Sequence, residues 1–280
     1  MPCDLHIHST HSDGTLTPAA LIAEAKRLGL TVALTDHNTV SGLTDFLNEA
    51  CKQGVTAIPG IEISSDLGGT ELHVVGLFIA PEHYAAIEKL MVRYHKLKEE
   101  SNIRLIENLR HAGYAIDYAS VQKRAAHGTP NRALIALELV EQGYVSSVQE
   151  AFDKLLKEKH GYYIPPERLT TAEAITFLRS IHALPVLAHP FLNLTEDALR
   201  AALPDLMEAG LVAMEVQHST YDDETITRAK AVADEFGLLY SGGSDFHGEP
   251  KPDVRLGVGK GNLDVPEAYL EALATRSKTL

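Results

Sequence analysis

Short apolar segments alternate with amphipathic helical segments along most of this chain, and this alternation restricts its fold more than any other feature. Seven segments have the pattern of buried strands, at residues 4–8, 31–35, 55–63, 71–79, 184–188, 211–216 and 238–241. Most of them precede a segment with helical periodicity, at residues 19–28, 42–52, 171–180, 196–209 and 223–236. This alternation predicts an α/β fold with a parallel sheet covered by helices on both faces.

One long stretch interrupts the alternation. A charged helical segment at residues 82–111 is followed by further helical sequence up to residue 156, without a clear strand pattern. We therefore predict two domains. Residues 1–99 and 171–280 would form the α/β domain, and residues 100–170 a helical insertion, which we call the cap.

Composition limits the classes of protein and partner. Apolar residues make up 45% of the chain and charged residues 22%, which is typical of a globular protein. No apolar run approaches the ~20 residues that span a bilayer, so we expect no membrane contact. The start of the chain lacks the pattern of a targeting segment, and Cys3 and Cys51 lack redox or zinc spacing, which predicts a cytoplasmic location.

The net charge of −13 argues against a long nucleic-acid duplex as a partner. An anionic substrate would instead need a local cationic patch, and bound metal ions are one way to make it.

Metal-ligand residue types recur where the predicted strands end. In residues 4–8, Leu5 and Ile7 alternate with His6 and His8, so both imidazoles point to the same face. The full set of candidate metal ligands is His6, His8, Asp13, His37, Glu62, His73, His189, Asp245 and His247. Except for His73, which comes early in its strand, these residues lie near the carboxyl end of a strand or in the following loop. In a barrel those ends meet at one rim.

The donor chemistry limits the choice of metal. Imidazole nitrogens and carboxylate oxygens without thiolates suit zinc, manganese or ferrous iron. Nine donors are too many for one ion and enough for two or three. We therefore expect two to three divalent ions.

Other residues are candidates for substrate contacts. His11 lies in the first loop, and His218 follows a strand end, where it could contact substrate or donate a proton. Arg132 and Arg168 are candidate phosphate ligands from the insertion. For these four residues, the sequence leaves an ordinary structural or surface role open as the alternative. An aromatic face of Tyr162 or Tyr163 could stack on a base.

The motifs resemble those of the PHP family, the polymerase and histidinol-phosphatase phosphoesterases. The matching segments are Asp4-Leu-His-Ile-His-Ser, Ser12-Asp-Gly, Thr35-Asp-His-Asn, Gly60-Ile-Glu-Ile-Ser, His73-Val-Val-Gly, Ala188-His-Pro and Ser244-Asp-Phe-His-Gly. The resemblance implies a distorted (βα)7 TIM-like barrel of the PHP type, which agrees with the seven predicted strands.

The resemblance also implies how the ligands divide among three ions. His6, His8, Glu62 and Asp245 would hold the first ion, and His73 and His189 would hold the second with Glu62 as a bridge. Asp13, His37 and His247 would hold the third. A water between two ions would attack phosphorus, with Asp245 and His218 as the catalytic residues. Manganese is the first choice of metal, with zinc or iron as alternatives.

Within the family, the chain resembles one branch in its short length and in the position of its insertion. Members of that branch act on nucleoside 3′,5′-bisphosphates and on short 5′-phosphorylated oligonucleotides. This resemblance predicts a phosphatase or phosphoesterase, a hydrolase whose substrate is a nucleotide or a short oligonucleotide. A histidinol-phosphate-type phosphatase and an amidohydrolase are alternative enzymes. A non-catalytic, metal-stabilised module is a third class, opposed by the complete ligand set. The sequence does not indicate which protein partners the chain has.

Overall fold

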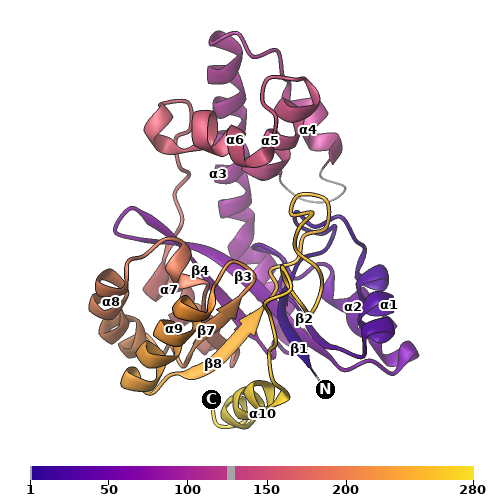
Figure 1. Cartoon of the computed structure of the whole chain (residues 1–280), viewed down its shortest axis with the longest axis vertical. Helices are drawn as coiled ribbons and strands as arrows, with labels where there is room; N and C mark the ends of the chain where they lie inside the picture. The colour runs from indigo at the N-terminus through magenta and orange to yellow at the C-terminus, as the bar shows by residue number, and fades with distance from the viewer. Residues whose placement is uncertain (1, 125–129) are drawn as a thin grey trace.

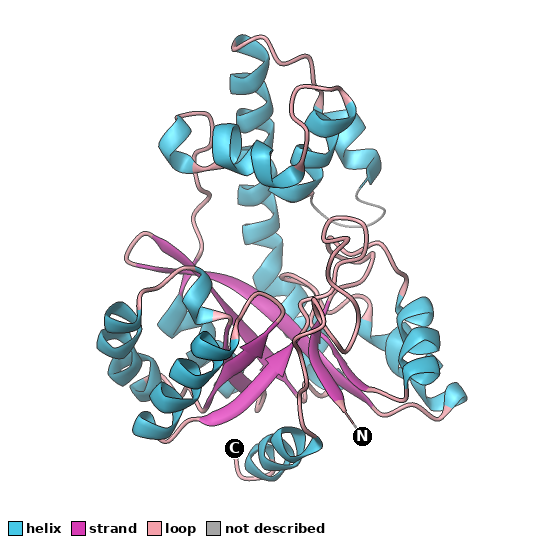
Figure 2. Ribbon diagram, viewed as in Figure 1, coloured by secondary structure: helices cyan, strands magenta, loops and turns pink. Residues whose placement is uncertain are grey.

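The computed structural model describes residues 2–124 and 130–280, and a strongly curved sheet forms its centre (Figures 1 and 2). The strand order is β1-β2-β3-β4-β6-β7-β8, and the short β5 pairs with β3. The strands are β1 (Cys3–Ile7), β2 (Thr31–Leu34), β3 (Ala57–Leu67), β4 (Thr70–Leu77), β5 (Leu169–Thr170), β6 (Leu184–Ala188), β7 (Ala213–His218) and β8 (Leu239–Gly243). Hydrogen bonds also connect the first and last strands of this order. The backbone N–H of His8 donates to the carbonyl of Phe246, and the backbone N–H of Asp245 donates to the carbonyl of His6. The seven main strands thus form a nearly closed barrel, as predicted.

The direction of β4 differs from the all-parallel sheet that the alternation predicted. β4 runs antiparallel to both β3 and β6. The reason is the turn between β3 and β4, where Gly68 and Gly69 have φ of 59° and 91° and Leu67 pairs with Thr70. Two residues can close an antiparallel hairpin, whereas a parallel connection needs a long crossover.

The reversal of β4 explains the unusual position of His73. Because β4 is antiparallel, its beginning lies at the rim where the neighbouring strands end. His73 pairs with Ser64 on β3 and with Ala188 on β6. An early position in this strand therefore places His73 beside the other candidate ligands.

Helices pack outside the barrel (Figure 1). They are α1 (Pro18–Leu28), α2 (Leu43–Gln53), α7 (Thr171–Ser180), α8 (Glu196–Glu208), α9 (Asp223–Phe236) and α10 (Glu267–Ser277). Thr17 caps the start of α1 and Gly29 ends it in the left-handed conformation. The sequence analysis did not predict α10, which lies at the end of the barrel opposite the cap (Figure 1). Its Leu273 is fully buried, in one apolar cluster with Val265.

The helices after β4 begin beside the barrel core and continue above the ligand-bearing rim (Figure 1). These elements are η1 (Pro81–His83), α3 (Tyr84–His111), α4 (Tyr118–Arg124), α5 (Arg132–Glu141), α6 (Val148–Ala151), η2 (Phe152–Leu156) and η3 (Glu158–His160). Ile87 and Met91 of α3 join the barrel core, whereas Leu105 and Leu109 join a separate apolar cluster within the cap. The predicted boundary at residue 100 falls inside this continuous helix, so the division into two domains remains a prediction.

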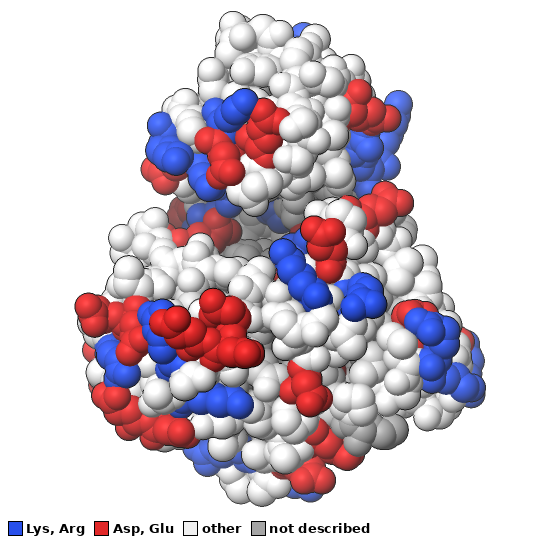
Figure 3. Space-filling view, in the orientation of Figure 1, with Lys and Arg blue, Asp and Glu red and all other residues white. Residues whose placement is uncertain are grey.

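Among the described residues, no helix combines the length and the apolar character needed to cross a membrane. Figure 3 shows acidic and basic side chains interspersed on the visible face, and a hollow between the cap and the barrel.

Candidate metal centre

The fold brings all nine candidate metal ligands together at one rim of the barrel. Donor atoms within 4.8 Å of one another form four overlapping groups. The groups are His6, His8 and Asp245; His6, Glu62 and His189; His37, Glu62 and His73; and His8, Asp13, His37 and His247. Four residues belong to two groups each, so the geometry does not impose the division among three ions that the resemblance implied. They are His6, His8, His37 and Glu62. The roles of all nine residues as ligands remain predictions.

Glu62 occupies the centre of this arrangement. Its carboxylate is fully buried, and each of its two oxygens faces a different set of imidazoles. Oε2 lies 3.2 Å from the Nε2 atoms of both His6 and His8 and 3.0 Å from His37 Nδ1, whereas Oε1 lies 2.7 Å from His73 Nδ1 and 3.0 Å from His189 Nε2. A carboxylate with this arrangement can bridge two cations.

The residues fit a cluster of divalent cations. His8 and His247 stack with ring centroids 4.1 Å apart. His37 Nδ1 and Glu62 Oε2 are buried 3.0 Å from each other, but neither makes a hydrogen bond to a described residue. Buried imidazoles and carboxylates at such density are costly unless cations or protons compensate them. Nitrogen and oxygen donors without a thiolate match zinc, manganese or iron.

Burial and neighbouring charges perturb the pKa values in this centre. Burial alone would lower the pKa of His8, but hydrogen bonds with Asp245 and Glu62 raise it to about 9. Burial would also lower the pKa of His73, but the Glu62 charge raises it to about 10. Burial dominates at His37 and lowers its pKa to about 4. For Glu62 itself, burial would raise the pKa, but the surrounding imidazoles hold it well below its usual range.

Metal binding near neutral pH is expected to release about three protons per chain. With pKa values of about 9 and about 10, His8 and His73 hold a proton at neutral pH in the metal-free chain. Burial would lower the pKa of His6, but the charges of Glu62 and Glu215 hold it well above its usual value, so His6 holds a proton as well. Each of the three must lose this proton to bind a metal. Protons and metal therefore compete, and the affinity for metal should increase as the pH rises toward the pKa values of these histidines. Calorimetric titration with manganese in buffers of different ionisation enthalpy measures this release. A binding heat independent of the buffer would contradict the prediction.

Two further carboxylates position the candidate ligands. Glu215 on β7 accepts a hydrogen bond from His6 Nδ1 at 2.8 Å and another from the backbone N–H of His189 at 2.7 Å. Asp36 accepts hydrogen bonds from the backbone N–H of Ser9 and from the hydroxyls of Ser9 and Ser12, which fixes the loop that carries Asp13. Hydrogen bonds of this kind, from residues that do not bind the metal themselves, orient the metal ligands. The sequence analysis missed the role of Glu215, although a carboxylate within an apolar strand is a signal that could have revealed it.

The candidate catalytic residues His218 and Asp245 are neighbours. His218 is buried, with Nε2 3.3 Å from Asp245 Oδ2 and Nδ1 2.8 Å from Thr220 Oγ1. The sequence analysis missed Lys251, whose Nζ lies 2.5 Å from the same Asp245 oxygen. Lys251 comes from the loop after β8, and no sequence motif marks it. His11 lies farther along the rim, where its Nδ1 is 2.9 Å from Ser41 Oγ.

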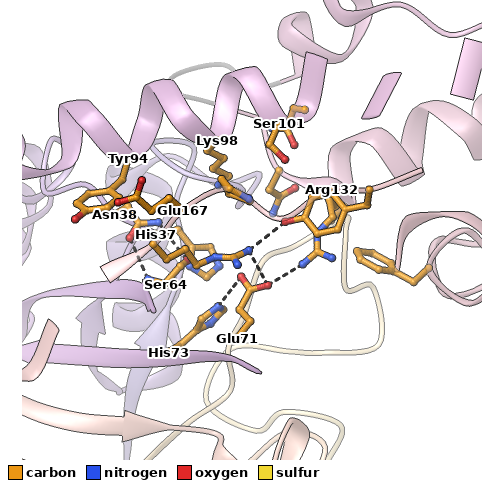
Figure 4. A pocket seen from close by; sticks show the side chains of 17 residues that line it. His37, Asn38, Ser64, Glu71, His73, Tyr94, Lys98, Ser101, Arg132 and Glu167 are labelled. Atoms are coloured by element: carbon orange, nitrogen blue, oxygen red, sulfur yellow. Dashed lines mark hydrogen bonds and ion pairs between the residues drawn. The ribbon is translucent and has the colours of Figure 1, made fainter. Parts of the chain in front are cut away.

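The cap closes a cavity of about 160 Å³ over this rim (Figure 4). His37 and His73 line it from the barrel, and Arg132 and Arg168 line it from the other side. The Nη2 atoms of the two arginines lie 2.9 and 3.0 Å from the same oxygen of Glu71. Lys98 of α3 lines the same cavity, and the sequence analysis missed both Lys98 and Glu71.

The expected stacking of Tyr162 or Tyr163 on a base needs correction. The Arg132 guanidinium lies over the Tyr163 ring, 4.2 Å from its centroid, and Tyr163 is largely buried. Tyr163 therefore supports an arginine, while Tyr162 packs against the apolar cluster of the cap. Among the described residues, three aromatic rings of tyrosine or phenylalanine line the cavity, those of Tyr163, Phe152 and Tyr94. Tyr94 belongs to α3.

The barrel and its rim of imidazoles and carboxylates define a metal-dependent hydrolase. Residues 4–164 match the model of the PHP domain. The chain is 34% identical to the 5′-3′ exoribonuclease Rnm of Escherichia coli over 258 residues, which cover 91% of this chain and 87% of that protein. It is 29% identical over 263 residues to the 3′,5′-nucleoside bisphosphate phosphatase of Chromobacterium violaceum, with 90% of each chain covered.

A solved structure shows the same fold over nearly the whole length. A metal-dependent phosphoesterase from Bifidobacterium adolescentis superposes with a TM-score of 0.86 and 26% identity, covering 99% of this chain and 98% of that one. This chain belongs to the PHP family and is a metal-dependent phosphoesterase. The predictions of the family, the barrel fold and the class of enzyme are therefore confirmed.

Proposed function

We propose that the enzyme hydrolyses the 3′ phosphoester of nucleotides that carry a 5′ phosphate. Its substrates would be nucleoside 3′,5′-bisphosphates and short 5′-phosphorylated oligonucleotides. The observation that carries this proposal is the cavity that joins His37 and His73 of the metal centre to Arg132 and Arg168. The names of the two relatives support it, because one acts from the 5′ end of RNA and the other on a bisphosphate.

The two arginines are arranged to bind an anion. One Glu71 oxygen lies within 3.0 Å of both guanidiniums, at a position that a phosphate oxygen could take (Figure 4). Guanidinium groups bind phosphate through paired hydrogen bonds. The ammonium of Lys98 adds a third positive charge on the wall of the cavity. A 5′ phosphate held here would leave the 3′ phosphorus for the metal centre.

We propose that the nine candidate ligands hold two to three divalent ions. Manganese is the proposed metal, with zinc or iron as alternatives. When bound, such ions polarise the phosphoryl group and acidify water. Elemental analysis of the purified protein tests both the number and the identity of the ions.

The side chains of the chain itself supply the remaining chemistry. Glu62 and Asp245 offset part of the positive charge of the ions. His218 is placed to give a proton to the departing 3′ oxygen, because it is buried next to Asp245 and is held by Thr220. The cap would exclude water and position the nucleotide.

Two further proposals concern organisation and location. The barrel would comprise residues 1–99 and 171–280 and the cap residues 100–170, which the separate apolar cluster of the cap supports. A cytoplasmic location is supported by Cys3 and Cys51, which lack the spacing of a disulfide framework.

A substrate screen with manganese-loaded protein tests the proposal. The panel contains a nucleoside 3′,5′-bisphosphate, the matching 5′-monophosphate, a 5′-phosphorylated oligonucleotide, histidinol phosphate, and amide and lactone substrates. We expect phosphate or mononucleotide release from the bisphosphate and the oligonucleotide, and little from the monophosphate. Preferential cleavage of histidinol phosphate would support the alternative phosphatase, and preferential cleavage of an amide or lactone would support an amidohydrolase.

A further inference from the structure

The Glu71 carboxylate lies where the proposed function places the 5′ phosphate of the substrate, and we propose that it is an internal competitor for that site. It occupies the two arginines of the cavity when no nucleotide is bound, and it displaces the 5′ phosphate when the product leaves. This inference rests on the proposed function, since it assumes that Arg132 and Arg168 hold the 5′ phosphate.

The contacts of Glu71 are those that a bound phosphate would make. Its Oε2 atom lies 2.9 Å from Nη2 of Arg132 and 3.0 Å from Nη2 of Arg168 (Figure 4). Carboxylates and phosphates bind guanidinium groups through the same kind of charged hydrogen bond. The two anions therefore exclude each other, and Glu71 must release the arginines before a phosphate binds to them.

The arginines have supports that do not depend on Glu71. The Arg132 guanidinium lies over the ring of Tyr163, 4.2 Å from its centroid, and Nη2 of Arg168 donates a hydrogen bond to the Tyr163 hydroxyl at 3.1 Å. Glu71 belongs instead to the barrel strand β4. When its side chain moves away, the two guanidiniums therefore remain beside Tyr163 and stay available to a ligand.

Glu71 can leave the arginines without a change in the backbone. Glu71 pairs with Asp66 on β3, and its carbonyl accepts a hydrogen bond from Asn193 Nδ2 at 2.9 Å, so its main chain is fixed. The other carboxylate oxygen, Oε1, lies 3.5 Å from Nε2 of His73. Rotation of the side chain can thus free the arginines while one oxygen stays beside this imidazole.

The reaction explains why such a competitor is useful. Water bonds to the 3′ phosphorus, the bond from that phosphorus to the 3′ oxygen breaks, and this oxygen leaves with a proton. The 5′ phosphate is unchanged, so the arginines hold substrate and product through the same contacts. Tight contacts of this kind slow the release of product, a step that limits turnover in many enzymes.

Burial of the arginines adds a second reason. Only 24% of the Arg132 side chain and 11% of the Arg168 side chain are exposed. Partly buried charges without a counter-ion are unfavourable, so departure of the product alone would be costly. Glu71 supplies the counter-ion at that moment, and it weakens the binding of any 5′ phosphate in proportion to the time that it occupies the arginines.

Binding of adenosine 5′-monophosphate to the manganese-loaded enzyme tests the inference. Glu71→Gln keeps the size of the side chain and removes its charge. We expect Kd for the monophosphate to fall by about tenfold, which corresponds to occupation of the arginines by Glu71 for about nine-tenths of the time. The inhibition constant of the monophosphate against bisphosphate hydrolysis should fall by the same factor. Loss of metal or of folded protein would weaken binding, so neither can produce this gain.

Glu167→Gln is the matched control. Glu167 lines the same cavity, but it pairs with Arg93 at 2.6 Å, and 58% of its side chain is exposed. Because solvent screens an exposed charge, this substitution should change Kd by less than about twofold. A second comparison shows whether Glu71 acts through the arginines. When Arg132 and Arg168 are both replaced by alanine, the further change Glu71→Gln should no longer tighten binding.

Glu71→Ala removes the same charge and repeats the test if the glutamine variant does not fold. Unchanged or weaker binding of the monophosphate to a folded, metal-loaded Glu71 variant would overturn the inference. A gain that persists without the two arginines would overturn it as well. If the unaltered enzyme does not cleave a nucleoside 3′,5′-bisphosphate, the proposed function itself fails, whatever the Glu71 variants bind.

Discussion

Replacement of Glu62 by glutamine is expected to lower kcat by more than about 100-fold. Loss of a residue that only supports a metal ligand lowers activity by up to about 100-fold, and loss of a ligand itself should cost more. Glutamine has nearly the same size, but it is neutral and its nitrogen donates where the carboxylate oxygen accepts. Both Glu62 oxygens face imidazoles, at distances from 2.7 to 3.2 Å. A neutral amide cannot bridge two cations as a carboxylate can, so the metal content should fall as well.

Three measurements distinguish loss of metal from loss of the fold. These are kcat, the number of ions per chain, and the difference in Tm with and without a chelator. In Glu62→Gln we expect this difference in Tm to shrink, because less metal binds to the native state. Glu138→Gln is a suitable control. Glu138 is also a buried carboxylate, but it lies in the cap and pairs with Arg124 at 2.8 Å. The control should lose stability while it keeps its metal, and Glu62→Gln with full metal and full activity would refute the central role of Glu62.

Replacement of Arg132 by alanine is expected to reduce kcat/KM for a nucleoside bisphosphate by about 10- to 100-fold. This range corresponds to one charged hydrogen bond of about 1.5–3 kcal/mol. In the structure the Arg132 guanidinium lies 2.9 Å from Glu71 and stacks on Tyr163, which holds it in place at the cavity. A small ester such as p-nitrophenyl phosphate has no second phosphate, so its hydrolysis should hardly change.

The ratio of the two activities in one preparation is the decisive quantity. Loss of active protein would lower both rates equally, whereas loss of a phosphate contact changes the ratio. Arg104→Ala removes an exposed arginine on α3 and should leave both activities intact. If Arg132→Ala lowers both activities to the same extent, Arg132 has a structural role, and if it lowers neither, the cap arginine does not bind substrate.

The sequence by itself determined the local structure and the chemical character of the centre. Periodicity located the seven main strands and most of the helices around them, because this signal depends on residues close together in the chain. Helices α7 and α9 have the predicted bounds, Thr171–Ser180 and Asp223–Phe236. The positions of histidines and acids at strand ends predicted a rim of ligands, because parallel strands in a barrel end on one side.

Only the tertiary structure decided what depends on contacts between distant segments. The antiparallel course of β4 follows from a two-residue turn, and it accounts for the position of His73. Glu215 becomes a partner of His6 through a contact between residues 209 positions apart. Lys98 and Glu71 face Arg132 and Arg168 because α3 carries the cap across the rim (Figure 4). Local periodicity contains no information about such neighbours, since packing of the helices and strands against one another determines them.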